Sequence, residues 1–175
     1  MGGTNSLVNI SQNSTINISN TSTPVSVVIW AKVPAGYSNN DGLWNKQLGP
    51  GSYDGFRLSV GATNSLTFGF NGVSQNYNTA SSTNVFTANT WAMFTTVIQA
   101  GTSYVYVNDN STPVISQTTS DSFSFQANLQ IGQSIQGDGS YLPMTWGQFR
   151  YYKGKALSTS EISTLFNDDK STYGL

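Results

Sequence analysis

Short runs of alternating apolar and polar residues recur along the chain, and Gly, Asn, Ser and Pro separate them. Such alternation, over about four to eight residues, is typical of β-strands with one buried face. The runs that we expect to be strands are 7–10, 15–18, 25–33, 56–60, 66–70, 90–98, 102–107, 123–125, 129–131 and 145–152. Residues 36–54 and 133–141 are Gly-rich and polar and are predicted loops. Many short strands between turns predict an all-β sandwich or barrel.

One segment departs from this pattern and predicts a helix near the C-terminus. Ser158 and Glu161 have the spacing of a capping box, in which each side chain bonds to the other residue's backbone. Ile162, Leu165 and Phe166 then fall on one face at helical spacing. We expect a short helix over 158–167, because the following polar residues disfavour continuation.

The composition is that of a single domain with few charges. The chain has 175 residues, and Asp, Glu, Lys and Arg make up only 9% of them, with a formal net charge of −1. We therefore expect one domain over residues 1–175 with a surface of hydroxyls and amides. No basic stripe is present, which argues against nucleic-acid binding. No apolar stretch is long enough to span a membrane.

Four segments, in order along the chain, carry motifs that occur together in one family of domains. The strand 27–32 carries a tryptophan and a lysine, 104–109 carries a Tyr-Val-Asn hairpin motif, and Leu129-Gln130-Ile131-Gly132 follows them. The most specific motif is the closing stretch 149–166, which runs from a strand arginine into the helix. Together these segments resemble laminin G-like domains of the concanavalin A-like family.

This resemblance covers roughly residues 5–168 and implies two packed antiparallel sheets in a jelly-roll arrangement. Members of the family serve in carbohydrate recognition, in adhesion and as accessory modules of enzymes and viral proteins. The chain departs from the family pattern at 146–149, where an acidic residue is often found, and at Asp109, which replaces a hairpin glycine. The first departure weakens any transfer of a charged site.

The inventory of reactive side chains argues against an enzyme. The chain has no Cys and no His, so nucleophilic triads are excluded. Glycoside hydrolysis needs two carboxylates about 5–10 Å apart. The one glutamate, Glu161, is used by the helix cap, and none of the seven aspartates pairs with another at alternate strand positions. We expect no catalytic residues.

Aromatic and polar residues in the two predicted loops are the candidate ligand site. A sugar site often combines an exposed ring with amide and carboxylate groups. The candidates are Trp44, Asp41, Gln136, Asp138 and Tyr141. The alternative is that the rings pin the loops to the sandwich or line a subunit interface.

Other polar residues favour structural roles. Asp109 and Asp138 could contribute to a calcium site, but turn residues are the preferred interpretation, so no cofactor is expected. Arg57 and Arg150 lie within predicted strands. We expect each to pair with a nearby carboxylate or carbonyl.

Two functions remain open. The first is a non-catalytic binding or scaffolding domain displayed outside the cell, most naturally a phage virion surface protein such as a capsid decoration or receptor-binding subunit. The absence of a signal-peptide pattern at residues 1–4 and the uncharged surface motivate it. It predicts protein partners and a homo-oligomer. The alternative is a lectin module of a secreted adhesin or enzyme, with glycans as partners.

Overall fold

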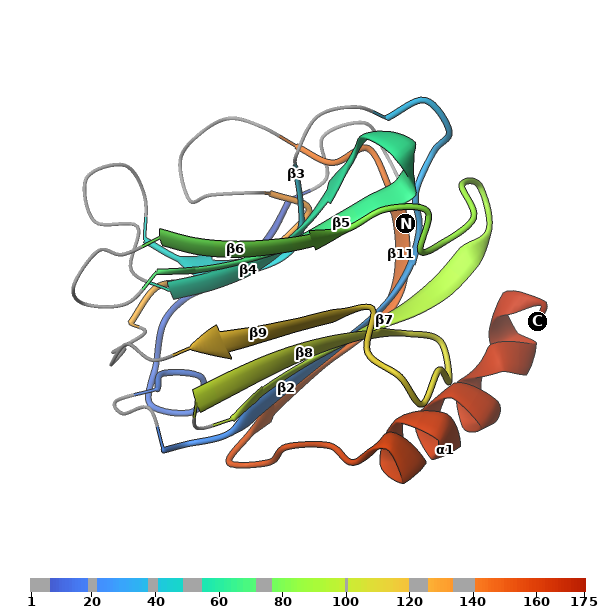
Figure 1. Ribbon diagram of the computed structural model, residues 1–175. Helices are drawn as coiled ribbons and strands as arrows, with labels where there is room; N and C mark the ends of the chain where they lie inside the picture. The colour runs from blue at the N-terminus through green and yellow to red at the C-terminus, as the bar shows by residue number, and fades with distance from the viewer. Residues whose placement is uncertain are drawn as a thin grey trace.

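Two antiparallel sheets face each other in the computed structural model, which describes residues 7–18, 22–37, 41–48, 55–71, 77–99, 101–119, 126–133 and 141–175 (Figure 1). The six-stranded sheet has the order β1 (Val8–Ile10), β10 (Leu129–Ile131), β3 (Asp41–Gln47), β4 (Gly55–Gly61), β5 (Ser65–Asn71), β6 (Tyr77–Ser82). The five-stranded sheet has the order β11 (Thr145–Lys153), β2 (Val25–Lys32), β7 (Trp91–Gln99), β8 (Gly101–Val107), β9 (Ile115–Thr119). The predicted sandwich is confirmed.

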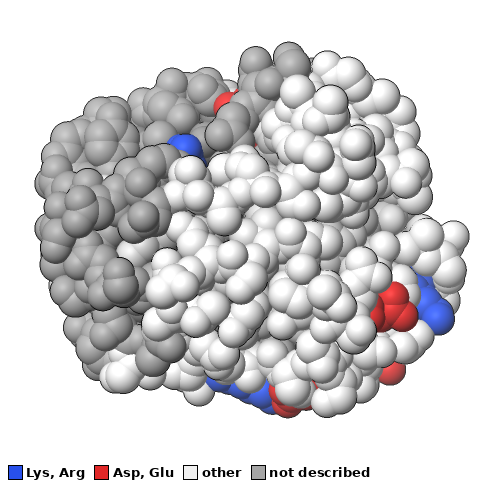
Figure 2. All heavy atoms as spheres, in the orientation of Figure 1, with Lys and Arg blue, Asp and Glu red and all other residues white. Residues whose placement is uncertain are grey.

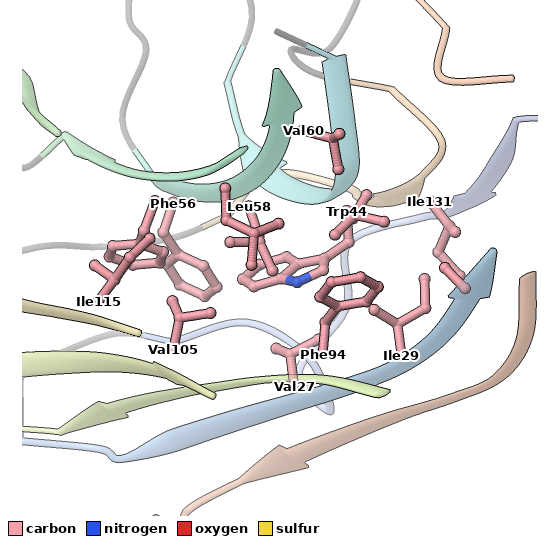
Figure 3. Packing of buried hydrophobic residues seen from close by; sticks show 14 of the residues in the cluster. Val27, Ile29, Trp44, Phe56, Leu58, Val60, Phe94, Val105, Ile115 and Ile131 are labelled. Carbon is pink, nitrogen blue, oxygen red and sulfur yellow. The ribbon is translucent and has the colours of Figure 1, made fainter. Parts of the chain in front are cut away.

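Alternation along each strand decides which side chains fill the space between the sheets. In β4, Phe56, Leu58 and Val60 point inward and are buried (Figure 3). From the facing sheet, Val27 and Ile29 of β2 contribute to the same core. Successive strand residues point to opposite faces, so the residues between these are placed on the outer faces of the sandwich.

A second, smaller apolar cluster lies outside the sandwich, where α1 (Thr159–Asp169) and the 3₁₀ turn η2 (Lys170–Tyr173) cover the five-stranded sheet. Ile162 and Phe166 are buried in this cluster with Val28 and Trp30 of β2. The Trp30 ring stacks on Phe166 and on Tyr173, with centroid distances of 5.5 and 4.3 Å. No helix in the described part of the chain is long and apolar enough to cross a membrane.

Capping and one ion pair fix this helix in place. The Ser158 hydroxyl accepts a hydrogen bond from the backbone N–H of Glu161, and the Glu161 carboxylate accepts one from the backbone N–H of Ser158. The predicted capping box is therefore confirmed. At the other end, Asp169 accepts a hydrogen bond from buried Trp30 Nε1 at 3.1 Å. Arg150 of β11 donates to both Asp169 oxygens, at 2.5 and 3.0 Å. The expectation that Arg150 pairs with a carboxylate is therefore confirmed, and these hydrogen bonds lower the pKa of Asp169.

The structure corrects several sequence predictions. Residues 15–18 form a turn and a single bridge rather than a strand, and β1 pairs instead with β10. The predicted loop 36–54 contains β3. The strands β6 and β9 were not predicted, because their mostly polar residues lack an apolar stripe. The helix extends to Asp169 rather than ending at 167. The predicted strand 123–125 lies outside the described residues.

Candidate functional site

Trp44 belongs to the core, so its predicted role as an exposed ring is wrong. Its side chain is 0% exposed and meets the ring of Phe56 edge to face, with centroids 5.3 Å apart (Figure 3). The cause is the strand β3, which directs position 44 inward opposite Leu58. The ring therefore holds this segment to the sandwich, which is the alternative that the sequence left open.

Two of the other four candidates, Asp41 and Tyr141, lie within the described residues. Asp41 is buried at the start of β3 opposite Val60, and it accepts a hydrogen bond from the Tyr37 hydroxyl. Burial and this carboxylate raise the pKa of Tyr37. Tyr141 is half-buried and forms a β-bridge with Gln133. Gln136 and Asp138 lie outside the described residues.

A different set of polar side chains does gather, on the outer face of the six-stranded sheet. These residues alternate with core residues along their strands, so they point away from the core. All of them are nevertheless buried. We call this set the polar face; it comprises Asn45 of β3, Arg57 and Ser59 of β4, Asn71 of β5 and Gln130 of β10.

Strand register places the amides of the polar face directly beside its arginine. Gln130 lies opposite Asn45, and Asn45 lies opposite Arg57. The next residue in the row is Gly69 of β5, which has no side chain to shield Arg57 on that flank. Side chains directly opposite one another on neighbouring strands lie within about 5.5 Å at Cβ, so this row is a continuous strip.

Hydrogen bonds preorganise the amide end of this strip. Asn45 Nδ2 donates to Gln130 Oε1 at 3.2 Å and to the Gln133 carbonyl at 2.6 Å. Gln133 also forms a β-bridge with Tyr141. Tyr141, whose side chain is half-buried, therefore lies at the edge of the polar face. Amide groups fixed in this way can present their remaining donors and acceptors in set directions.

The adjacent row of the same face consists of small residues. Gly42, Ser59, Thr67 and Ser81 lie opposite one another in that order across four strands. Thr67 Oγ1 and Ser81 Oγ are hydrogen bonded at 2.8 Å. Ser59 is 0% exposed, and its Oγ has no hydrogen-bond partner. A buried hydroxyl without a partner is costly, which makes Ser59 a candidate for a ligand contact.

Charge is sparse at this site and elsewhere. Arg57 is the only charged residue that the described strands place on the outer face of the six-stranded sheet. No group of three His, Cys, Asp or Glu side chains suited to a metal occurs among the described residues. Figure 2 shows a surface that is mostly uncharged, with acidic and basic side chains gathered mainly at its lower right and lower edge.

One further charged side chain is buried inside the sandwich. Lys46 is 0% exposed, and its Nζ donates to the Ala127 carbonyl at 2.6 Å and to Asn17 Oδ1 at 3.4 Å. Burial, helped by the charge of Lys153, lowers the pKa of Lys46 to about 8. Lys46 lies opposite core residue Phe56, so it faces away from the polar face and links the segments that contain Asn17 and Ala127.

A family model of the concanavalin A-like lectin/glucanases superfamily matches residues 2–163. The chain belongs to this superfamily. Solved structures share its fold at low sequence identity. The botulinum neurotoxin serotype D binding domain is 18% identical, with a TM-score of 0.68 over 93% of this chain and 40% of that one. A structure of NanB with Optactamide is 16% identical, with a TM-score of 0.75 over 94% of this chain and 26% of that one.

The chain spans well under half the length of these two structural relatives. Among curated proteins, none matches it in sequence. The expected family resemblance is confirmed, whereas the phage setting is a hypothesis that neither the fold nor these relatives address.

Sequence reasoning missed the polar face because its residues look like ordinary solvent-facing positions. In Phe56-Arg57-Leu58-Ser59-Val60, strict alternation predicts that 57 and 59 point outward, and they do. Nothing in that pattern says that they are also buried or that Asn45 and Gln130 lie beside them. That information comes from the register of β3, β4 and β10.

Proposed function

We propose that this chain is a non-catalytic carbohydrate-binding domain and that the polar face supports its ligand site. The observation that carries the proposal is the buried row Gln130, Asn45 and Arg57 beside the unpartnered hydroxyl of Ser59. Amide, guanidinium and hydroxyl groups donate and accept the hydrogen bonds that sugar hydroxyls require, and a few convergent polar groups are typical of ligand sites.

Two further structural relatives support this proposal by what they bind. One is a receptor-binding domain of botulinum neurotoxin D, 18% identical with a TM-score of 0.70. Another is a structure of botulinum neurotoxin type C, whose passage into cells depends on interaction with two ganglioside molecules, 16% identical with a TM-score of 0.59. Gangliosides carry glycan headgroups, so glycan binding on this fold is a consistent expectation for the present chain.

The absence of catalysis is part of the proposal. Glycosidases of the common type place two carboxylates on either side of the scissile bond. The described residues of the polar face include neither Asp nor Glu. Asp41 lies opposite the core residue Val60 and accepts a hydrogen bond from the Tyr37 hydroxyl. Glu161 caps α1, which covers the other sheet. A binding function needs no such pair.

We also propose that the domain acts outside the cell. A glycan-binding domain acts where glycans are, which fits display outside the cell. Two hypotheses from the sequence are retained within this setting, namely a virion surface subunit and an association of identical chains. A measurement of molar mass by light scattering tests the second, because a clean monomer at working concentration contradicts it.

A glycan array, run with calcium and again with EDTA, tests the proposed function. We expect reproducible binding to a defined glycan class in both buffers. Ser59→Ala removes a hydroxyl that has no partner in the fold, so it should weaken glycan binding without lowering the melting temperature. Asn110→Ala, at an exposed position after β8, is the matched control and should change neither.

A blank array in both buffers would contradict glycan binding and would favour protein partners. Binding that disappears only in EDTA would show that a metal takes part. Binding that survives Ser59→Ala and Gln130→Ala unchanged would place the ligand away from the polar face.

A further inference from the structure

We propose that a pocket at one end of the sandwich binds the oxyanion of a small ligand, a carboxylate, sulfate or phosphate group that is held by Lys153. The pocket lies where β11 ends and β2 begins, beside the turn 13–16. It shares no lining residue with the polar face, so this site goes beyond the proposed function. Its volume is about 590 Å³, which is within the usual range of about 300–1,000 Å³ for small-molecule sites.

The lining of the pocket combines an apolar interior with polar groups at its open side. It includes Ser14, Thr15 and Ile16 of the turn, Thr23 ahead of β2, and Tyr151 and Lys153 of β11. Ile16 is buried and Tyr151 is half-buried, whereas Ser14, Thr15 and Lys153 are exposed. A ligand therefore meets two hydroxyls and an ammonium group first and an aliphatic side chain and a ring behind them, a mixture that is typical of small-molecule sites.

Hydrogen bonds hold the two walls of the pocket together. The Tyr151 hydroxyl donates to the Ile16 carbonyl at 3.0 Å, and Lys153 Nζ donates to the Ser14 carbonyl at 2.7 Å. An ammonium group has three donors, so Lys153 has two more to offer to a ligand. Because its side chain is already held in place, binding an anion costs little ordering of the lysine.

Strand alternation directs two lysines from opposite sheets into this end of the interior. Lys153 lies opposite Val25 and Lys46 lies opposite Phe56, and both of these partners belong to the core. The two ammonium groups are close enough for the charge of Lys153 to contribute to the lowered pKa of Lys46. Among the described residues, their hydrogen-bond acceptors are carbonyl and amide oxygens, with no carboxylate.

Lys46 is bonded to the back of the pocket wall. Its Nζ donates to Asn17 Oδ1 at 3.4 Å, and Asn17 directly follows Ile16 of the lining. Two like charges near each other, one of them shielded from water, repel each other and make the pocket electropositive. An oxyanion bound to Lys153 offsets that repulsion and receives charge-assisted hydrogen bonds. The pocket therefore favours an anionic group over a neutral or cationic one.

Calorimetric titration of the full chain with small anions at pH 7 tests the inference. The probes are sulfate, inorganic phosphate, glucuronate and glucose 6-phosphate, and the controls are glucose and sodium chloride at equal ionic strength. We expect at least one oxyanion to bind and neither control to do so. Tighter binding of sulfate or phosphate identifies a free inorganic ion as the ligand, and tighter binding of the other two identifies an anion carried on a sugar.

The pH dependence of binding reports the contribution of Lys46. Sulfate and glucuronate keep a constant charge between pH 7 and 9.5, whereas Lys46, with a pKa of about 8, loses its proton in this range. Their affinity should therefore fall about 5-fold over it. Lys153 and Tyr151 face the same space. Tyr151 stays protonated here, because burial raises its pKa.

Three variants connect binding to the two lysines. Lys153→Gln removes the charge that contacts the ligand and should lower affinity about 10-fold or more. Lys46→Met leaves the lining intact, and it should weaken binding at pH 7 about 5-fold and abolish the pH dependence. Lys170→Gln changes net charge by the same amount at η2, outside the pocket, and should leave binding unchanged.

Failure of all four oxyanions to bind would overturn the inference, and so would wild-type affinity in a folded Lys153→Gln variant. If Lys153→Gln does not fold, Lys46→Met decides instead, because binding that keeps the wild-type pH profile in that variant contradicts the site. Neither result bears on glycan binding by the polar face, which the glycan array and Ser59→Ala test separately.

Discussion

Lys46 provides a direct test of the interior of this sandwich, because its charge is buried and its partners among the described residues include no carboxylate. Replacing it by Met keeps a straight side chain beside Phe56 and removes the charge. The described partners of its ammonium group are oxygens of Ala127 and Asn17. We therefore expect Lys46→Met to change how the free energy of unfolding depends on pH.

The magnitude and sign follow from the pKa of Lys46, which is about 8 in the folded protein against an ordinary value of 10.5. Between these two values the unfolded chain holds the proton and the folded chain has released it, so the free energy of unfolding rises with pH. At about 1.4 kcal/mol per pH unit, the buried charge costs about 3 kcal/mol of stability at pH 7. About 2 kcal/mol of this is regained between roughly pH 7.5 and 9.5.

Urea unfolding at pH 7.5, 8.5 and 9.5, followed by tryptophan fluorescence, measures this effect. The difference in stability between the wild type and Lys46→Met should shift by about 2 kcal/mol across the series, in favour of the wild type at high pH. Lys170→Met, which removes a lysine from η2 instead, is the control and should run parallel to the wild type. Parallel curves for Lys46→Met would refute the reasoning, because the lysine would then titrate alike in both states.

Two further predictions concern the attachment of α1. Asp169→Ala leaves Trp30 Nε1 without its acceptor and Arg150 without its partner, and chemical unfolding should show a loss of about 2–4 kcal/mol. Because the pKa of Asp169 is lowered in the folded protein, this contribution to stability is present above about pH 4 and is lost as the pH falls further. A difference in the free energy of unfolding between wild type and variant that stays constant down to pH 2 would contradict this. Gly147→Ala would place a methyl group against the Tyr173 ring, whose hydroxyl accepts from Gln148 N–H at 2.8 Å. We expect a lower melting temperature by calorimetry, corresponding to about 1–3 kcal/mol, and an unchanged value would show that the ring moves aside freely.

The sequence predicts those elements whose residues follow a simple period. Strict alternation in β4, the continuous runs of strand-forming residues in β2 and β7, and the capping box of α1 locate these elements to within a few residues. β3 was missed because it begins with Asp-Gly, and its bulge between Gly42 and Trp44 breaks the alternation. β6 was missed because its residues are mainly Ser, Thr and Asn, whose strand state depends on pairing with β5.

The candidate site was harder to predict, for a related reason. Trp44 looked like an exposed loop residue because its neighbours in sequence are polar, yet Lys46 two positions later is also buried. The polar face joins Gln130 to Asn45 across 85 positions in sequence. No local pattern reports a contact over that separation, so only the register of the strands reveals the site.

The way α1 and η2 attach also determines where this domain ends as a unit that can be moved or joined to another protein. The residues that match the family end at 163, but Phe166, Asp169 and Tyr173, which all contact Trp30, lie beyond that point. A chain shortened to the family match would expose an aromatic surface on the five-stranded sheet and would tend to aggregate. A fusion made after Leu175 keeps this surface covered and leaves the polar face, which lies on the opposite sheet, unaltered.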